Sequence, residues 1–265
     1  MCETCGCNIT PGNATLAQQP VAAGQTTVQV LENLLHANDH TAAHNRQHFD
    51  QHGVLAVNLM SSPGSGKTAL LEATIRAGAG LRCAVIEGDL ETENDAARIR
   101  AHGVPAIQIT TGTACHLDAH LVHDALHQLP LADLDVVFIE NVGNLVCPAS
   151  FDLGHHLAVT LLSVTEGDDK PSKYPVMFRG SDAVVISKLD VAPYFDDFDP
   201  KRAEANVRAL GCGAPVIQTS VKTPEGIAGW LDWLRTMQGR FVAGARFGRE
   251  HDHHHHHHEH DHASG

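Results

Sequence analysis

The sequence lacks any run of about 20 apolar residues, the length that a membrane-spanning helix needs. It also carries little positive charge, because 18 basic residues stand against 31 acidic ones, with a formal charge of −13 and no long run of lysine and arginine. This balance argues against nucleic acid and acidic membranes as partners. The first seven residues have neither a basic region nor an apolar stretch, so we expect no signal peptide and a cytoplasmic protein. Its seven cysteines are then thiols or metal ligands.

Short apolar runs alternate with helical stretches over most of the chain. We expect strands at 54–60, 83–87, 106–110, 135–140, 183–187 and 215–219. We expect a first helix from near Glu32 to His52, ended by Gly53, and further helices at 68–79, 92–102, 113–128, 200–210 and 224–238. This alternation predicts an α/β fold: a mostly parallel sheet with helices on both faces.

We expect three parts along the chain. Residues 1–30 form a cysteine-containing segment with a flexible tether at 8–27, residues 31–240 form one domain, and residues 241–265 form a histidine-rich tail. A length of 265 residues allows one sizeable core with such appendages. The tail is either native or an engineered tag, and the acidic residues interleaved with its histidines favour a native tail.

Residues 61–68 read S-S-P-G-S-G-K-T and lie between an expected strand and an expected helix. In this context the pattern predicts a phosphate-binding loop, in which backbone N–H groups and the positive helix end hold the nucleotide phosphates. Lys67 would reach the β and γ oxygens, and Thr68 would ligate Mg²⁺. Ser61 stands where glycine is usual, and we interpret it as a variant rather than as a sign of a chance Gly/Ser loop. The residues expected to contact the nucleotide here are Gly64, Ser65, Gly66, Lys67, Thr68 and Ala69.

The segment S-K-L-D at 187–190 follows an expected strand and indicates GTP rather than ATP. The Asp190 carboxylate can accept hydrogen bonds from guanine N1–H and the exocyclic amine, whereas adenine would leave it unpaired. The stem of Lys188 would pack over the base. GTPases usually have asparagine where this chain has Ser187, which weakens one orienting contact. Ser220 and Val221 fit the short loop that often completes a guanine pocket.

Two acids are candidates for control of Mg²⁺ and water. Glu140, at the start of E-N-V-G, ends an apolar strand, and Asp89 ends an earlier one. Either carboxylate can hold Mg²⁺ directly or through water; the alternative is that both are ordinary polar residues at strand ends. With Lys67 they form the expected catalytic set. No residue is an obvious activator of the attacking water, so we expect slow hydrolysis until a partner or a dimer completes the site.

Two groups of residues have the chemistry of metal ligands. The thiols of Cys2, Cys5 and Cys7, together with the α-amine, suit Ni²⁺ or Zn²⁺, and a fortuitous cluster is the weaker alternative. The second group is Cys115, His116 and Cys147, which His120 could join from one helical turn further on. Cys147 lies seven residues after Glu140, so a metal there would be linked to the nucleotide through a short loop. Taken singly, Cys115 and Cys147 are more often buried thiols, which is also our interpretation of Cys83 and Cys212.

Histidine is unusually abundant, with 21 residues. Five of them recur every four residues along the first expected helix, at His36, His40, His44, His48 and His52. Neighbouring pairs can chelate a divalent ion across one turn, although the series drifts around the helix. A solvated polar face is the favoured alternative.

Together these residues resemble the hydrogenase nickel-incorporation GTPases, the HypB family of SIMIBI-type P-loop GTPases. The resemblance covers about 34–234 and the N-terminal cysteines, and its specific segments are S-S-P-G-S-G-K-T, T-G-T-A-C-H-L-D-A, I-E-N-V-G-N-L-V-C-P-A-S-F-D-L-G and S-V-T-E-G-D-D-K-P-S-K-Y-P. It implies Mg²⁺-dependent hydrolysis of GTP to GDP and phosphate, coupled to nickel delivery into the [NiFe]-hydrogenase large subunit precursor. It also implies a nucleotide-promoted homodimer and transfer of nickel between metallochaperones.

The resemblance also implies a role for each cysteine group. Cys2, Cys5 and Cys7 would form a tight nickel site, and Cys115, His116 and Cys147 a weaker, nucleotide-sensitive one for Ni²⁺ or Zn²⁺ near the dimer interface. Ser187 departs from the family pattern, and neither the histidine helix nor the tail is explained by it. A nickel store, a metabolic P-loop kinase and a urease-type accessory GTPase are the alternatives, of which the N-terminal cysteines disfavour the last.

Overall fold

A computed structural model describes residues 27–78, 80–89, 94–112 and 114–247, with the backbone alone for 27–33. The expected N-terminal cysteine site and the histidine-rich tail from residue 248 lie outside these ranges, so the expected division into three parts stays a prediction. Among the described helices, none combines the length and apolar character that a membrane span requires.

Seven parallel strands form one sheet, in the order β3-β2-β4-β1-β5-β6-β7. The strands are β1 (Leu55–Ser61), β2 (Cys83–Asp89), β3 (Ala106–Thr110), β4 (Val136–Glu140), β5 (Leu157–Ser163), β6 (Ala183–Ser187) and β7 (Val216–Gln218). The central strands β1, β4 and β5 are buried along their whole length, as strands covered on both faces must be. The expected fold class and all six expected strands are confirmed. β5 was not expected.

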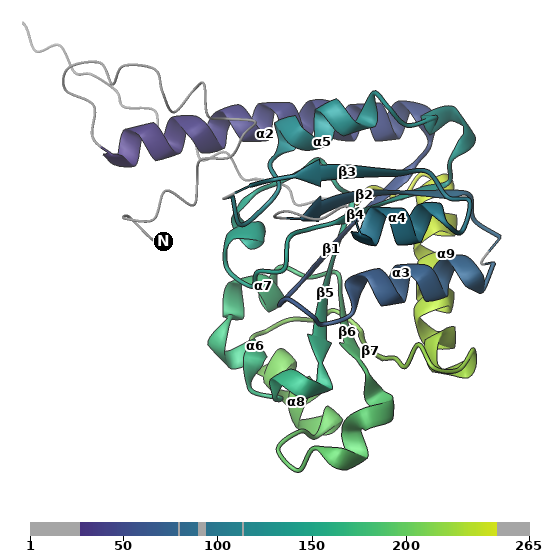
Figure 1. The fold of residues 1–265 in the computed structure, drawn as a ribbon. Coiled ribbons are helices and arrows are strands. Elements are labelled where there is room, and N and C mark those ends of the chain that lie inside the picture. The colour runs from purple at the N-terminus through teal and green to yellow at the C-terminus, as the bar shows by residue number, and fades with distance from the viewer. Residues whose placement is uncertain (1–26, 79, 90–93, 113, 248–265) are drawn as a thin grey trace, which may run out of the picture.

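Helices cover both faces of the sheet (Figure 1). They are α2 (Thr27–His52), α3 (Lys67–Arg76), α4 (Asn94–Arg100), α5 (Ala119–Leu126), α6 (Lys170–Lys173), α7 (Pro175–Arg179), α8 (Pro200–Ala209) and α9 (Ala228–Val242). Helices α3, α4 and α9 pack on one face. On the other face, α2 and α5 cover the β2–β4 side, and α7 and α8 cover the β5–β6 side.

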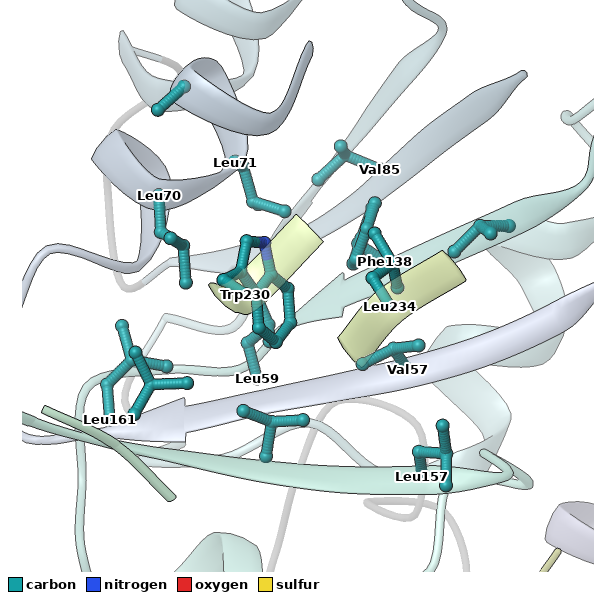
Figure 2. Close-up of a cluster of buried hydrophobic side chains, with 14 of the residues drawn as sticks. Val57, Leu59, Leu70, Leu71, Val85, Phe138, Leu157, Leu161, Trp230 and Leu234 are labelled. Atoms are coloured by element: carbon teal, nitrogen blue, oxygen red, sulfur yellow. The ribbon is translucent and has the colours of Figure 1, made fainter. Parts of the chain in front are cut away.

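Trp230 of α9 fills the centre of the first face. Figure 2 shows its indole between Leu70 and Leu71 of α3 and the strand residue Leu59. The side chain is fully buried, and its ring N–H donates to Thr74 Oγ1 at 2.9 Å. A buried indole with a satisfied N–H is a strong anchor, because it combines a large apolar area with one hydrogen bond. Helix α3, which begins at the phosphate loop, is therefore held in place by α9.

Helix boundaries differ from expectation in three places. The first helix begins at Thr27 rather than near Glu32. The helix expected over 113–128 is limited to α5, because the Asp118 side chain accepts a hydrogen bond from Leu121 N (2.9 Å) and caps the helix there. The helix expected over 224–238 begins as a short 3₁₀ turn at Glu225–Ile227 and continues to Val242 as α9.

Candidate nucleotide and metal site

Several of the expected site residues lie at the carboxyl ends of strands, where ligands bind in open parallel sheets. Ser61 ends β1, Asp89 ends β2, Glu140 ends β4 and Ser187 ends β6. Because the strands are parallel, these four ends meet at one edge of the sheet. The expected positions of Asp89, Glu140 and Ser187 at strand ends are confirmed.

The phosphate loop connects β1 to α3. Gly66 caps α3 with φ of 95°, a left-handed conformation that side chains resist, and Lys67 is the first residue of the helix. The N–H groups of the first helical turn have no intrahelical partner, so this turn is suited to an anion. Lys67 is buried, and its Nζ donates to Ser61 Oγ at 3.0 Å. The serine at the unusual position thus holds the lysine above the loop.

Three carboxylates converge beside this loop. Oxygens of Glu87, Asp95 and Glu140 lie within 4.8 Å of one another. Thr68 Oγ1 donates to Glu140 Oε1 at 2.8 Å, and neither Glu140 Oε2 nor Glu87 Oε2 has a hydrogen-bond partner within the described part of the chain. Burial raises the pKa of Glu140 to about 7, although the positive charge of Lys67 offsets part of the effect. Burial and the nearby charge of Glu140 raise the pKa of Glu87 to about 8.

Sequence reasoning missed Glu87 and Asp95. Glu87 pairs directly with Glu140 in the register of β2 and β4, so acids near the ends of two adjacent strands were a usable signal. Asp95 lies on α4, and nothing in its local sequence marks it. Asp89 is outside the three-acid cluster but lines the same cavity of about 350 Å³, a volume within the range of small-molecule sites. The walls of this cavity are Pro63, Gly64, Gly66, Lys67, Thr68, Ala69, Glu87, Gly88, Asp89, Asp95, Arg98, Glu140, Asn141, Val142 and Gly143.

The expected base-binding residues lie at the other end of the phosphate loop. Ser220 Oγ donates to Asp190 Oδ1 at 2.7 Å, so the two residues expected in the guanine pocket are in contact. Lys188 Nζ donates to Gly64 O at 2.7 Å, and Lys188 is the one non-glycine residue with positive φ among those described. Val221 packs against the apolar cluster under α3 and α9.

Ser187 makes a contact that its short side chain was not expected to make. Its hydroxyl donates to Ser65 O at 2.6 Å, and the group is buried. The hydroxyl of Ser65 in turn donates to Glu166 Oε2 at 2.8 Å. The strand end that precedes the base-binding segment is therefore joined to the phosphate loop through serine instead of asparagine.

The second expected metal group is brought together. Cys115 Sγ lies 3.1 Å from Cys147 Sγ and 3.7 Å from His116 Nδ1. His116 is fully buried and stacks on Phe151 with ring centroids 4.0 Å apart. Burial lowers the pKa of His116 to about 4, so its imidazole is neutral at neutral pH and keeps a lone pair for a metal. Two thiols and one neutral imidazole suit Zn²⁺ or Ni²⁺.

His120 is not part of this group in the structure. Its ring nitrogens lie 3.3 and 3.4 Å from Thr41 Oγ1 of α2. The expectation assumed that His116 and His120 share a helical face, but α5 begins at Ala119, so His116 precedes the helix. Cys83 and Cys212 were expected to be buried thiols rather than ligands. Cys212 is buried in an apolar cluster, and burial raises the pKa of the Cys83 thiol to about 11.

The loop from Glu140 to Cys147 connects the two sites by direct contacts. Asn141 Oδ1 accepts from Leu117 N (3.1 Å), next to His116, and Asn144 Nδ2 donates to Cys115 O (3.3 Å). The same loop holds Thr68 at its first residue and reaches the thiol cluster at its last. A displacement of this loop would therefore change contacts both at Thr68 and at the thiol cluster.

Comparison with known proteins is consistent with this geometry. Residues 55–218 match the family profile described as "CobW/HypB/UreG, nucleotide-binding domain". The chain is 48% identical to the hydrogenase maturation factor HypB of Azotobacter chroococcum, over 84% of this chain and 73% of that protein, and 49% identical to the Escherichia coli K12 factor, over 82% and 76%. The crystal structure of HypB from Helicobacter pylori in complex with nickel is 40% identical and superposes with a TM-score of 0.76, covering 80% of this chain and 99% of that one.

Proposed function

Because this chain belongs to the CobW/HypB/UreG nucleotide-binding family and, within it, to the hydrogenase maturation factors HypB, we propose that it hydrolyses GTP to control the release of nickel. The nickel ion is cargo, bound by the protein and destined for the [NiFe]-hydrogenase large subunit precursor. One observation carries the proposal: a single loop contacts Thr68 through Glu140 and places Cys147 3.1 Å from Cys115.

Lys67 and the first turn of α3 hold the triphosphate. Lys67 exchanges its hydrogen bond to Ser61 for phosphate oxygens, and the unpaired N–H groups of the helix end point at the same anion. Asp190 accepts hydrogen bonds from the guanine edge, with Ser220 orienting its carboxylate and Lys188 beside the phosphate loop. Adenine would leave Asp190 without these partners, which disfavours ATP.

The oxygen-rich cluster beside Thr68 fits Mg²⁺. Hard carboxylate and hydroxyl oxygens are its preferred ligands, and the unpartnered oxygens of Glu140 and Glu87 are available to it or to its water ligands. Thr68 would ligate the ion, with Glu140 or Asp89 holding it directly or through water. A bound Mg²⁺ would neutralise part of the negative charge on the phosphates. The chain's own residues position the nucleotide, and no described side chain is an evident activator of the attacking water, which fits slow hydrolysis completed by a homodimer or another partner.

Hydrolysis acts on nickel through the connecting loop. When the contact between Glu140 and Thr68 changes with the γ-phosphate, Asn141 and Asn144 transmit the change to the backbone on both sides of His116. The geometry around Cys115, His116 and Cys147 then differs between nucleotide states, and so does its affinity for Ni²⁺, with Zn²⁺ as a competing ion. This coupling is reciprocal: if GTP weakens nickel binding, nickel weakens GTP binding by the same factor.

The remaining features of the proposal rest on the family. The thiols of Cys2, Cys5 and Cys7 form the tighter nickel site, a nucleotide-promoted homodimer places the weaker site near its interface, and cytoplasmic metallochaperones exchange nickel with the protein.

The test compares nickel affinity in two nucleotide states. The full chain carrying Cys2→Ser, Cys5→Ser and Cys7→Ser is titrated with Ni²⁺ in the presence of Mg²⁺ and either GDP or a non-hydrolysable GTP analogue. We expect affinities that differ by about fivefold or more. The matched variant with Cys147→Ser added should bind nickel more weakly and show no such difference. Equal affinities in the two nucleotide states would overturn the coupling.

A further inference from the structure

Four histidines from two helices meet on the surface formed by α2 and α5, away from the residues assigned above. These helices pack side by side (Figure 1). His44 and His48 are one turn apart on α2, and His123 and His127 are four residues apart at the end of α5. We name these four residues the histidine cluster. The sequence showed the α2 series, but the long-range packing supplies the partners from α5.

The rings of His44, His48 and His123 lie close enough to share one ion, and His127 adjoins His123. Ring centroids are 4.6 Å apart for His123 and His127, 4.7 Å for His44 and His48, and 5.1 Å for His44 and His123. One nitrogen from each of His44, His48 and His123 lies within 4.8 Å of the others. His127 Nε2 lies 3.1 Å from His123 Nε2, near the roughly 3.3 Å that separates two nitrogens bound to a tetrahedral zinc ion.

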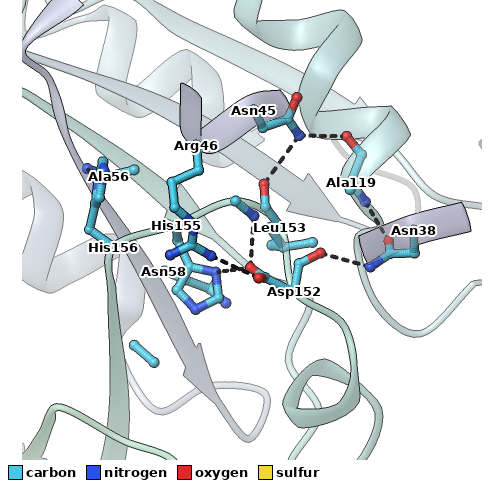
Figure 3. A network of polar contacts seen from close by, with 12 residues as sticks. Asn38, Asn45, Arg46, Ala56, Asn58, Ala119, Asp152, Leu153, His155 and His156 are labelled. Carbon is cyan, nitrogen blue, oxygen red and sulfur yellow. Dashed lines mark hydrogen bonds and ion pairs between the residues drawn. The ribbon is translucent and has the colours of Figure 1, made fainter. Parts of the chain in front are cut away.

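The surrounding hydrogen bonds fix which nitrogen of His123 is free to bind. Asn45 donates from Nδ2 to the carbonyls of Ala119 (2.8 Å) and Leu153 (3.2 Å), as Figure 3 shows. Its Oδ1 is therefore the acceptor that faces His123 Nδ1 at 2.9 Å. His123 Nδ1 carries the proton, and the Nε2 lone pair points to His127. An imidazole held by a hydrogen bond from its second nitrogen is the arrangement seen in metal-ligating histidines.

We propose that the histidine cluster is an additional metal site that takes a borderline divalent ion, Ni²⁺ or Zn²⁺, through imidazole nitrogens alone. Binding requires that the His127 proton move from Nε2 to Nδ1, which leaves both rings neutral and changes no net charge. The ion joins α2 to α5 and shares no ligand with the thiol cluster. His36 and His40 are exposed on the same helix and do not come together with other possible ligands among the described residues.

Histidine footprinting of the full-length protein tests the site residue by residue. Diethylpyrocarbonate modification is measured without metal and with excess Ni²⁺ alone or Zn²⁺ alone. Mass spectrometry locates each modified histidine, so metal binding by the C-terminal tail is measured in separate peptides. We expect modification of the histidine cluster to slow several-fold, while His36 and His40 react at unchanged rates. Equal protection of His40, or unchanged rates at the cluster, would overturn the proposal.

Paired variants add a second readout. His44→Ala with His127→Ala removes two exposed ligands, and His36→Ala with His40→Ala removes two exposed histidines outside the cluster. A metal that binds only the folded chain raises its melting temperature, by about 5–10 °C at a hundredfold excess over Kd for this size. We expect the double variant at His44 and His127 to lose this metal-dependent rise in melting temperature while its GTP hydrolysis is unchanged. The double variant at His36 and His40 should keep the rise. An equal rise in both pairs would contradict the site. Because GTP hydrolysis is measured in the same samples, failure of this site is distinguishable from failure of the proposed function.

Discussion

Gly143 lies against Pro63 so closely that a β-carbon on Gly143 would stand 2.7 Å from the Cα of Pro63. Pro63 belongs to the phosphate loop, and Gly143 to the loop that runs from Glu140 to the thiol cluster. No side chain fits between them. This contact therefore keeps the connecting loop in register with the nucleotide site.

Gly143→Ala should separate the two loops. The added methyl meets backbone rather than a movable side chain, so we expect a loss of about 1–3 kcal/mol in the free energy of unfolding. GTP affinity should fall as well, together with the dependence of nickel affinity on nucleotide. Urea unfolding and GTP titration measure both effects. The control is Gly239→Ala in α9, where a β-carbon meets nothing within 4 Å and helix propensity favours alanine. Wild-type stability and coupling in Gly143→Ala would refute the assigned role.

Glu140→Gln should abolish Mg²⁺-dependent hydrolysis without unfolding the protein. Glutamine can still accept the hydrogen bond from Thr68, but it removes the negative charge that the cation needs. We expect the hydrolysis rate to fall by about 10²-fold or more, with a free energy of unfolding equal to or above that of the wild type, because a buried carboxylate is costly. Phosphate release and urea unfolding check the two parts. The control Glu204→Gln, in a surface pair with Arg208 on α8, should change neither. A variant with the wild-type rate and Mg²⁺ dependence would rule Glu140 out.

Ser187→Ala should weaken GTP binding more than the replacement of a comparable buried serine elsewhere in the domain. The change breaks the 2.6 Å hydrogen bond to Ser65 O, worth about 1 kcal/mol, so we expect roughly a fivefold loss in GTP affinity. Ser181→Ala is the matched control, because its buried hydroxyl bonds Thr160 and Met177 within the same domain. Both variants should lose stability, but only the first should lose GTP affinity. Similar GTP affinities in the two would show that Ser187 is merely structural.

Cys147→Ser should reduce the metal affinity of the thiol cluster by tenfold or more, because a hydroxyl is a poor ligand for Ni²⁺ or Zn²⁺. Even the loss of a residue that only hydrogen-bonds to a ligand lowers metal affinity by about 10–100-fold. The measurement is metal titration in the absence of the N-terminal cysteines. Cys212→Ser, at a buried thiol in an apolar cluster, is the control and should keep metal affinity despite some loss of stability. Unchanged affinity in Cys147→Ser would remove this residue from the site.

His156 should make stability depend on pH. Its Nδ1 accepts from Ala56 N at 2.9 Å, and its Nε2 lies 3.1 Å from Asp50 Oδ1. Burial lowers its pKa below the ordinary 6.5, an effect that Asp50 only partly offsets. Because the folded pKa is the lower one, this stabilisation is complete above about pH 6.5 and is lost as the pH falls through the folded value.

His156→Asn keeps an acceptor for the Ala56 N–H and removes the titration. Between about pH 7.5 and about pH 5.5 the variant should lose less of its free energy of unfolding than the wild type. Urea unfolding at the two pH values provides the comparison. His40→Asn, at an exposed position on α2, should follow the wild type. A variant whose stability falls with pH as steeply as the wild type's would show that His156 does not cause the dependence.

Local sequence was sufficient where one segment carries the whole signal. The turn after the first strand and six of the strands follow from patterns that act over a few residues. β5 was missed although L-A-V-T-L-L-S is a largely apolar run like those expected as strands at 54–60 and 183–187.

Long-range packing set the limits elsewhere. Glu87 becomes part of the acid cluster only through its register with Glu140, and His120 left the expected metal group because the Asp118 cap starts α5 after His116. The contact of Ser187 with Ser65 joins positions 122 residues apart. No local pattern could have placed the α5 histidines against those of α2.

The place of Trp230 has a consequence for how the protein is made. The inner face of α3 is covered by α9, so a nascent chain that ends before residue 230 leaves Thr74 and the apolar face of α3 without this support. The packing of α3 is therefore complete only after α9 has been synthesised. A copy that stops short of α9 would leave the apolar face of α3 exposed to water.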